Sequence, residues 1–159
     1  MNKVYFLLGS NMGNSEEQLQ LAATNTEKYI GNIVAASSLY QTAAWGKTDQ
    51  PDFLNQVLIV ETELSAADTL SVLLAIEEKM GRVRTEKNAP RIIDIDILFF
   101  NDDIIQEKDL IIPHPEIQNR LFVLTPLNEL APNYIHPVLA KTIHELLLGC
   151  KDVLNVKKF

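Results

Sequence analysis

The chain has 159 residues, of which 47% are hydrophobic and 22% are charged, and its formal net charge at pH 7 is -7. This composition is typical of one soluble globular domain with a sizeable core, and the negative charge argues against broad binding to nucleic acid or to an anionic membrane. No apolar run approaches the roughly 20 residues that span a bilayer, and the lone Cys150 cannot form an internal disulfide. We therefore expect a cytoplasmic protein with one domain over residues 1–159.

Strand and helix patterns alternate along the first half of the chain. The elements expected there are a strand over 3–10, a helix over 15–30, strands over 32–42 and 53–64, and a helix over 65–81. Ser15 with Gln18, and Ser65 with Asp68, have the spacing of N-terminal helix caps. Gly81 is expected to end the second helix.

The second half continues with a strand and then with helical pieces. The elements expected there are a strand over 92–100, a short strand over 104–106, a helical stretch over 119–130 and a short helix that ends at Gly149. Pro126 is expected to interrupt the helical stretch, and Thr142 with Glu145 forms a capping box for the last helix. The order indicates an α+β fold, a ferredoxin-like βαββαβ core with an antiparallel sheet, helices packed on it and extra C-terminal helical pieces. This fold carries many functions, so function must be argued from a site.

Two carboxylates interrupt the apolar strand "RIIDIDILFF". Side chains at positions i and i+2 of a strand point to the same face, about 7 Å apart along the chain. Asp94 and Asp96 therefore share one face, while Ile93, Ile95 and Ile97 face the core. Two acids on one face repel each other unless a cation lies between them, and Mg²⁺ commonly takes one or two protein carboxylates together with phosphate oxygens.

A basic segment, "GRVRTEKNAPR", lies directly before this strand. Its charged residues are Arg82, Arg84, Glu86, Lys87 and Arg91. Guanidinium groups bind phosphates bidentately. Alone, an Asp-x-Asp pair is usually the polar half of an amphipathic strand, and a basic cluster is usually solvated surface. Because the two features are adjacent, we interpret them together as a Mg²⁺-dependent enzyme site that acts on a polyphosphate.

The chain resembles the 6-hydroxymethyl-7,8-dihydropterin pyrophosphokinase family over nearly its whole length. It carries "LGSNMGN", "SSLYQTAAWG", "QPDFLNQV", "GRVR" with "APRIIDIDILFF", and "IPHPEIQNRLFVLTPLNELAP", in the family's order and spacing. The resemblance implies a ferredoxin-like fold, a single pyrophosphokinase domain over 1–159, and transfer of the β,γ-pyrophosphoryl unit of ATP to the hydroxymethyl oxygen of the pterin. AMP would be released, in a step of folate biosynthesis.

The resemblance also implies roles for individual residues. The catalytic residues would be Arg82, Arg91, Asp94 and Asp96, the two aspartates also binding two Mg²⁺ ions. ATP, as co-substrate, would be held by Glu77, Arg82, Arg84, Lys87, Arg91, His114 and Arg120. The pterin would be held by Thr42, Ala44, Phe53, Asn55 and Phe122. The two phenylalanines would hold the flat ring between aromatic faces, and the asparagine would offer a donor and an acceptor.

Three alternatives compete with this interpretation. A non-catalytic nucleotide- or pterin-binding module on the same fold should have lost Asp94, Asp96 or Arg82, and all three are present. An RNA-binding module would carry stacking aromatics and basic residues on its sheet where this chain has acids. A phosphatase with an Asp-x-Asp nucleophile usually has that pair near its N-terminus. The expected partners are therefore ATP and the pterin, with no nucleic acid or membrane, and the expected state is a monomer.

Overall fold

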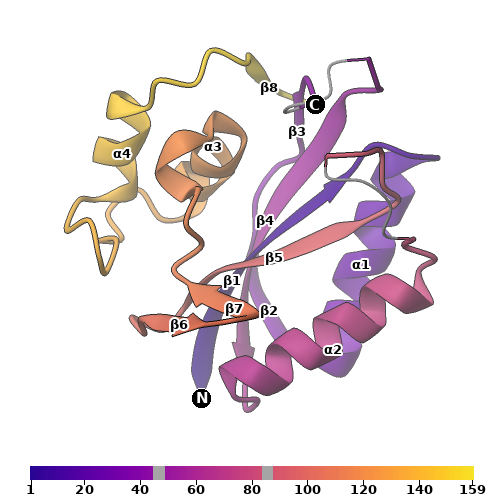
Figure 1. The fold of residues 1–159 in the computed structure, drawn as a ribbon, viewed down its shortest axis with the longest axis horizontal. Coiled ribbons are helices and arrows are strands. Elements are labelled where there is room, and N and C mark those ends of the chain that lie inside the picture. Colours follow the sequence, from indigo (N-terminus) through magenta and orange to yellow (C-terminus); the bar gives the residue numbers. More distant parts are fainter. Residues whose placement is uncertain (45–48, 84–87) are drawn as a thin grey trace.

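The sheet at the centre of the structure has the strand order of a βαββαβ ferredoxin-like fold. A computed structural model describes residues 1–44, 49–83 and 88–159. Its main sheet runs in the order β5-β1-β4-β3-β8, with β2 also paired to β4, and neighbouring strands are antiparallel (Figure 1). The strands are β1 (Asn2–Ser10), β2 (Gly31–Ala36), β3 (Tyr40–Thr42), β4 (Phe53–Thr62), β5 (Asp94–Phe100) and β8 (Val156–Lys158). The expected fold class is confirmed.

The strand expected over 32–42 is divided into β2 and β3, which pair with different halves of β4. Ser37 lies in the gap between them, where its backbone N–H donates to the Val57 carbonyl and its Oγ accepts from the Val57 N–H, both at 2.9 Å. This side chain replaces a ladder hydrogen bond, so the chain can bend without leaving a buried backbone group unpaired. The strand β8 was not expected, because its short lysine-rich sequence has no strand pattern of its own.

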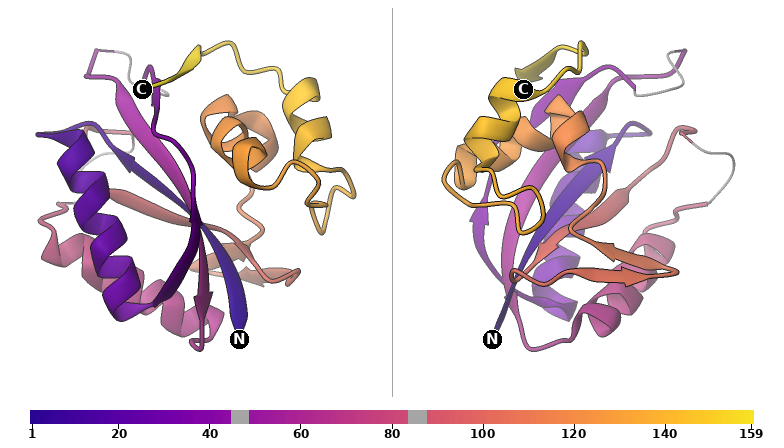
Figure 2. Two further views of the ribbon diagram at one scale, coloured as in Figure 1. Left: turned by 180° about the vertical axis from the view of Figure 1, so that it is seen from behind. Right: turned by 60° about the vertical axis from the view of Figure 1, so that its left-hand side comes forward.

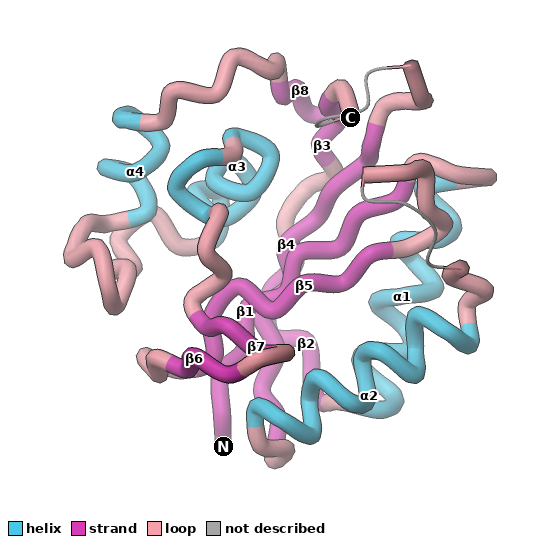
Figure 3. Tube along the Cα trace, in the orientation of Figure 1, coloured by secondary structure: helices cyan, strands magenta, loops and turns pink. Residues whose placement is uncertain are grey.

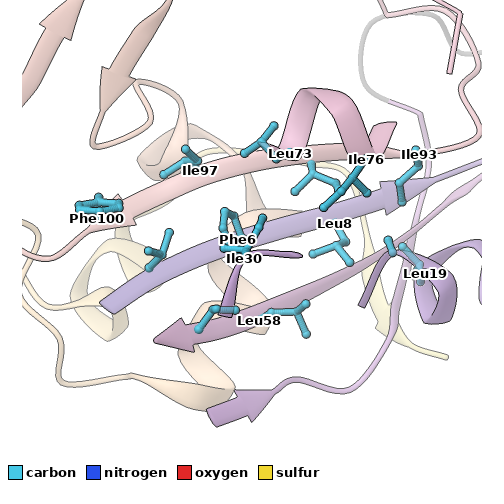
Figure 4. Packing of buried hydrophobic residues seen from close by; sticks show 14 of the residues in the cluster. Phe6, Leu8, Leu19, Ile30, Leu58, Leu73, Ile76, Ile93, Ile97 and Phe100 are labelled. Carbon is cyan, nitrogen blue, oxygen red and sulfur yellow. The ribbon is translucent and has the colours of Figure 1, made fainter. Parts of the chain in front are cut away.

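Helices cover both faces of the sheet (Figures 1 and 2). The helices are α1 (Ser15–Tyr29), α2 (Ala66–Lys79), α3 (Leu121–Leu130) and α4 (Ile143–Gly149). One buried cluster, which includes Phe6, Leu19 and Leu73, lies between the sheet, α1 and α2 (Figure 4). A second cluster, which includes Tyr5 and Leu124, lies between the opposite face, α3 and α4. The continuous apolar run of β1 follows from burial on both faces.

The helix caps agree with the sequence at two of three predicted positions. Ser65 accepts from the Asp68 N–H at 3.1 Å, and Thr142 forms the expected capping box with Glu145. The prediction for α1 is wrong by one residue, because Asn14 is the N-cap and its side chain accepts from the Glu17 N–H. Asn is at least as good a cap as Ser, so the first of the two polar residues begins the helix.

The expected break at Pro126 does not occur, and α3 continues through it. Pro126 and Leu127 are buried against the second core cluster, and this packing outweighs the hydrogen bond that proline removes. A 3-10 turn, Ile117–Asn119, precedes α3. The short strand expected over 104–106 is β6 (Ile105–Glu107), which forms a separate hairpin with β7 (Leu110–Ile112) beside β5 (Figure 3).

No helix in the described ranges has the length and apolar character needed to cross a membrane.

Candidate active site

The carboxylate pair lies at the beginning of β5, on the face of the sheet away from α1 and α2. Ile93, Ile95 and Ile97 all belong to the buried cluster under those helices. Asp94 and Asp96 alternate with them on the opposite face, and both aspartates line one cavity at the edge of β5 beside α2 and a second cavity over β1 and β4. The expected division of this strand into an apolar face and an acidic face is confirmed.

Two arginines hold Asp94, one at each carboxylate oxygen. Arg82 Nη1 donates to Asp94 Oδ1 at 2.9 Å and to the Ile93 carbonyl at 2.8 Å. Arg91 Nη1 donates to Asp94 Oδ2 at 3.2 Å. Arg82 reaches the site because Gly81, with a φ of 94°, turns the chain back at the end of α2. The side chains of Arg82 and Arg91 are only 13% and 18% exposed, so these ion pairs are partly shielded from water.

Asp96 lies in a more buried and more acidic environment. Burial, together with the nearby charges of Asp94 and Glu77, raises the pKa of Asp96 to about 8, although Arg120 and Arg82 oppose this shift. Glu77 is 2% exposed, and its carboxylate accepts a 2.7 Å hydrogen bond from the Ile95 N–H. This contact anchors α2 to β5 and directs a second negative charge toward Asp96. A bound cation would relieve the repulsion among these three acids.

The residues present fit a magnesium site in their chemistry. Asp94 and Asp96 offer carboxylate oxygens, the ligand type that Mg²⁺ prefers, beside a cavity large enough for a phosphate chain to complete the coordination. Within the described ranges no group of three or more His, Cys, Asp or Glu side chains could hold a metal ion. A pair of carboxylates beside such a cavity fits the kind of site in which Mg²⁺ is bound jointly by the protein and by substrate phosphates.

A cavity of about 330 Å³ lies on one side of the carboxylate pair. Its walls come from α2, from β5 and from the β6–β7 hairpin, and include Leu70, Leu74 and Glu77. Lys108 and Asp109, at the hairpin turn, also line it and were not predicted. No local signal marks these two residues, because the hairpin reaches the cavity only through its packing beside β5.

His114 lines this larger cavity and is uncharged near neutral pH. Burial lowers its pKa, and the charge of Arg120 lowers it further. Its Nδ1 accepts from the Glu116 N–H at 3.1 Å, so the proton of the neutral ring is on Nε2. His114 can therefore donate one hydrogen bond from Nε2 to an anionic group.

A smaller cavity of about 60 Å³ lies on the other side of the pair. It is lined by Leu7, Gly9, Phe53, Asn55, Arg91, Asp94, Asp96, Arg120 and Phe122. Three of the five residues predicted for the pterin, Phe53, Asn55 and Phe122, are therefore brought together. Leu7 and Gly9 were not among the residues predicted for the pterin, although Gly9 belongs to the quoted "LGSNMGN" block.

Polar groups in the smaller cavity are arranged around its aromatic walls. The Arg91 guanidinium carbon lies 5.0 Å from the centre of the Phe53 ring, and that of Arg120 lies 5.6 Å from the centre of the Phe122 ring. The Nδ2 of Asn55 is buried and has no hydrogen-bond partner among the described residues. A buried amide donor without a partner is costly, so its presence beside a cavity points to a ligand that accepts a hydrogen bond there.

Thr42 and Ala44 complete the set of residues predicted for the pterin. Thr42 is buried in β3 and donates its hydroxyl to the Asn155 carbonyl at 2.9 Å. Neither Thr42 nor Ala44 is among the described residues that line the smaller cavity. Arg84 and Lys87 lie outside the described residues.

Comparisons with known proteins identify the family of the chain. The family model for 7,8-dihydro-6-hydroxymethylpterin-pyrophosphokinase (HPPK) matches residues 5–132. The 2-amino-4-hydroxy-6-hydroxymethyldihydropteridine pyrophosphokinase of Haemophilus influenzae is 41% identical over 159 residues, covering 99% of this chain and 98% of the relative. The enzyme of the same name from Synechocystis is 40% identical over 141 residues, covering 88% of this chain and 72% of the relative.

Other relatives are longer proteins. The folic acid synthesis protein FOL1 of Dictyostelium discoideum is 39% identical over 98% of this chain, which spans only 23% of that relative. A crystal structure of HPPK-DHPS from Plasmodium falciparum has a TM-score of 0.79 at 24% identity, over 93% of this chain and 43% of that chain. The structural match shows the same fold. With the family model spanning most of its length, the chain belongs to the 7,8-dihydro-6-hydroxymethylpterin-pyrophosphokinase family.

Proposed function

We propose that this chain is a single pyrophosphokinase domain that transfers the β,γ-pyrophosphoryl group of ATP to the hydroxymethyl oxygen of 6-hydroxymethyl-7,8-dihydropterin. AMP is the second product, and the reaction belongs to folate synthesis. The single observation that carries the proposal is that one carboxylate pair, Asp94 and Asp96, lines two different cavities. A reaction between a nucleotide and a heterocycle requires two sites that meet where the phosphoryl group is transferred.

ATP occupies the larger cavity in this proposal. Leu70 and Leu74 provide an apolar wall for the base, and His114 donates from Nε2 to a phosphate oxygen. Arg82 and Arg91 exchange Asp94 for phosphate oxygens, because a guanidinium binds phosphate at least as well as it binds a carboxylate. The predicted ATP ligands Arg84 and Lys87 remain part of the proposal, since they belong to the same basic segment.

The pterin occupies the smaller cavity after that cavity has opened. A bicyclic ring is larger than 60 Å³, and the guanidinium groups of Arg91 and Arg120 lie over the aromatic faces on which it would stack. Phosphates in the neighbouring cavity attract both guanidinium groups away from Phe53 and Phe122. ATP therefore binds before the pterin, and Asn55 Nδ2 then donates to the ring's acceptor edge.

Asp94 and Asp96 are the proposed ligands for two Mg²⁺ ions. When bound, Mg²⁺ supplies positive charge that stabilises the transferring phosphoryl group and the departing AMP oxygen. The arginines add positive charge from the protein side, and the partly buried setting strengthens these interactions relative to water. We further propose that the protein acts in the cytoplasm as a monomer, without nucleic acid or membrane partners. A measurement of its molecular mass in solution would test the oligomeric state.

The test is product formation from ATP, Mg²⁺ and the pterin by the wild-type protein and by Asp96→Asn. We expect AMP only when the pterin is present, and a loss of at least about 100-fold in the variant, because removing a metal-binding carboxylate removes much of the charge stabilisation. Glu63→Gln, which removes an exposed carboxylate outside both cavities, is the matched control and should keep full activity. ADP formation, or AMP formation without the pterin, would contradict the proposal, and ATP binding without any product would favour a non-catalytic module.

A further inference from the structure

The last ten residues, 150–159, form a C-terminal segment that runs from α4 back to the edge of the sheet (Figure 2). This segment lies beyond residues 5–132, the part of the chain matched by the family model. It ends in β8, which pairs with β3 in a register that places Val156 opposite Thr42. The Phe159 N–H also donates to the Leu39 carbonyl at 2.9 Å.

Asp152 connects this segment to α3. Its Oδ2 accepts from the backbone N–H of Leu121, the first residue of α3, at 3.0 Å. Its Oδ1 accepts from the Leu154 N–H, also at 3.0 Å, which fixes the orientation of the carboxylate. Arg120, at the N-cap position of α3, makes no side-chain capping hydrogen bond. Asp152 thus supplies from the distant C-terminal segment the negatively charged cap that the local sequence of α3 lacks.

The first turn of α3 is also a wall of the smaller cavity. Phe122 lines that cavity one residue after the capped Leu121. On the opposite wall, Phe53 pairs with Thr42 of β3, whose hydroxyl donates to the Asn155 carbonyl. The stretch of chain from Asp152 to Val156 is therefore bonded both to the helix that carries one aromatic wall and to the strand beside the other.

We propose that Asp152 is a positioning residue for the pterin, one that fixes the first turn of α3 at the distance from β3 and β4 that lets Phe122 and Phe53 enclose the ring. The inference rests on the proposed function and adds to it a residue that does not contact the substrate. Its effect falls mainly on the pterin, because Asp152 and Asn155 bond to α3 and β3, whereas α2, β5 and the β6–β7 hairpin line the larger cavity.

The test compares Asp152→Ala and Asp152→Asn with Val153→Ala, a neighbouring residue that is 93% exposed. For Asp152→Ala we expect KM for the pterin to rise about five- to tenfold, the size of effect expected when a helix cap is lost. The dissociation constant for ATP, measured by equilibrium titration, should rise less than the KM for the pterin, because Phe122 lines the smaller cavity and is not among the described residues that line the larger one. Asp152→Asn keeps an oxygen acceptor and should recover most of the pterin affinity, and Val153→Ala should match the wild type.

Amide hydrogen exchange provides a second measurement that does not depend on activity. The Leu121 amide should exchange faster in Asp152→Ala than in the wild type and to a smaller extent in Asp152→Asn, and this smaller change is the readout if Asp152→Ala does not fold. An unchanged pterin KM in Asp152→Ala, equal losses of ATP and pterin affinity in that variant, or an unchanged exchange rate at Leu121 would overturn the positioning role. If the wild-type protein forms no pterin-dependent AMP, the proposed function fails. If the wild type is active and Asp152→Ala behaves like it, only the positioning role fails.

Discussion

Gly9 offers the sharpest test of the geometry of the smaller cavity. It lies in β1 opposite both Asn55 of β4 and Asp94 of β5. A Cβ atom added at this position would lie 2.8 Å from Asn55 Oδ1 and 3.8 Å from Phe53 Cδ1. The first of these separations is shorter than a van der Waals contact, and Asn55 is only 3% exposed, so its side chain cannot turn out to solvent and must shift within the site. Gly9→Ala should therefore lower the free energy of unfolding by about 1–3 kcal/mol, the usual cost of overpacking.

A double-mutant cycle with Asn55→Ala isolates this contact. If the clash with Asn55 is the cause, adding Gly9→Ala to the Asn55→Ala protein should lower the free energy of unfolding by less than about 0.5 kcal/mol. The coupling free energy between the two substitutions is then the difference between this cost and the cost of Gly9→Ala in the wild-type protein. Urea denaturation followed by circular dichroism measures all four proteins. An equal cost of Gly9→Ala in both backgrounds would refute the reasoning and would place the strain in the backbone of β1. In the protein that keeps Asn55, Gly9→Ala should also weaken pterin binding more than ATP binding. Among the described residues, Gly9 lines the smaller cavity and does not line the larger one.

Two further predictions concern buried groups. Glu77→Ala should lower the free energy of unfolding by about 1–3 kcal/mol, because it leaves the buried Ile95 N–H without its acceptor. Glu77→Gln keeps an acceptor and should lower that free energy by less. Equal losses for the two variants in urea denaturation would contradict this reasoning. His136 accepts two backbone N–H bonds at Nδ1, and burial lowers its pKa, so the unfolded chain takes up its proton first as the pH falls. The free energy of unfolding should therefore decrease below pH of about 6.5, by at most about 1.4 kcal/mol per pH unit from this group. His136→Asn, which keeps an acceptor, should remove that contribution, and an unchanged pH dependence would exclude the histidine as its source.

Local patterns in the sequence predict the main elements because short-range physics determines them. The alternation around Asp94 and Asp96 follows from strand geometry, and the caps at Ser65 and Thr142 follow from the need to satisfy free N–H groups at helix starts. The division of the second strand at Ser37 and the existence of β8 depend on pairing with distant residues. Such pairings leave no periodic signal in the segments themselves, so sequence patterns did not predict them.

The candidate site divides in the same way. The Asp pair and the arginines next to it are adjacent in the sequence, and residue chemistry alone indicated an anion and metal site there. Phe53 and Phe122 have no such signal, since by position they are ordinary core residues, and only the family resemblance singled them out. Gly9 and Lys108 reach the two cavities through strand register and hairpin packing, which become visible only in three dimensions.

The position of β5 explains how one pair of carboxylates can line two cavities. β5 is the first strand of the order β5-β1-β4-β3-β8, so only one of its sides is paired within the main sheet. On that side Gly9 and Leu7 of β1 lie opposite Asp94 and Asp96 and line the smaller cavity. On the other side the chain after β7 returns beside β5, where the His114 N–H donates to the Leu98 carbonyl at 3.0 Å, and the larger cavity opens between this chain and α2. A strand inside the sheet would have neighbours on both sides and could not separate two cavities in this way, so the edge position of β5 is what places the carboxylates between the two cavities.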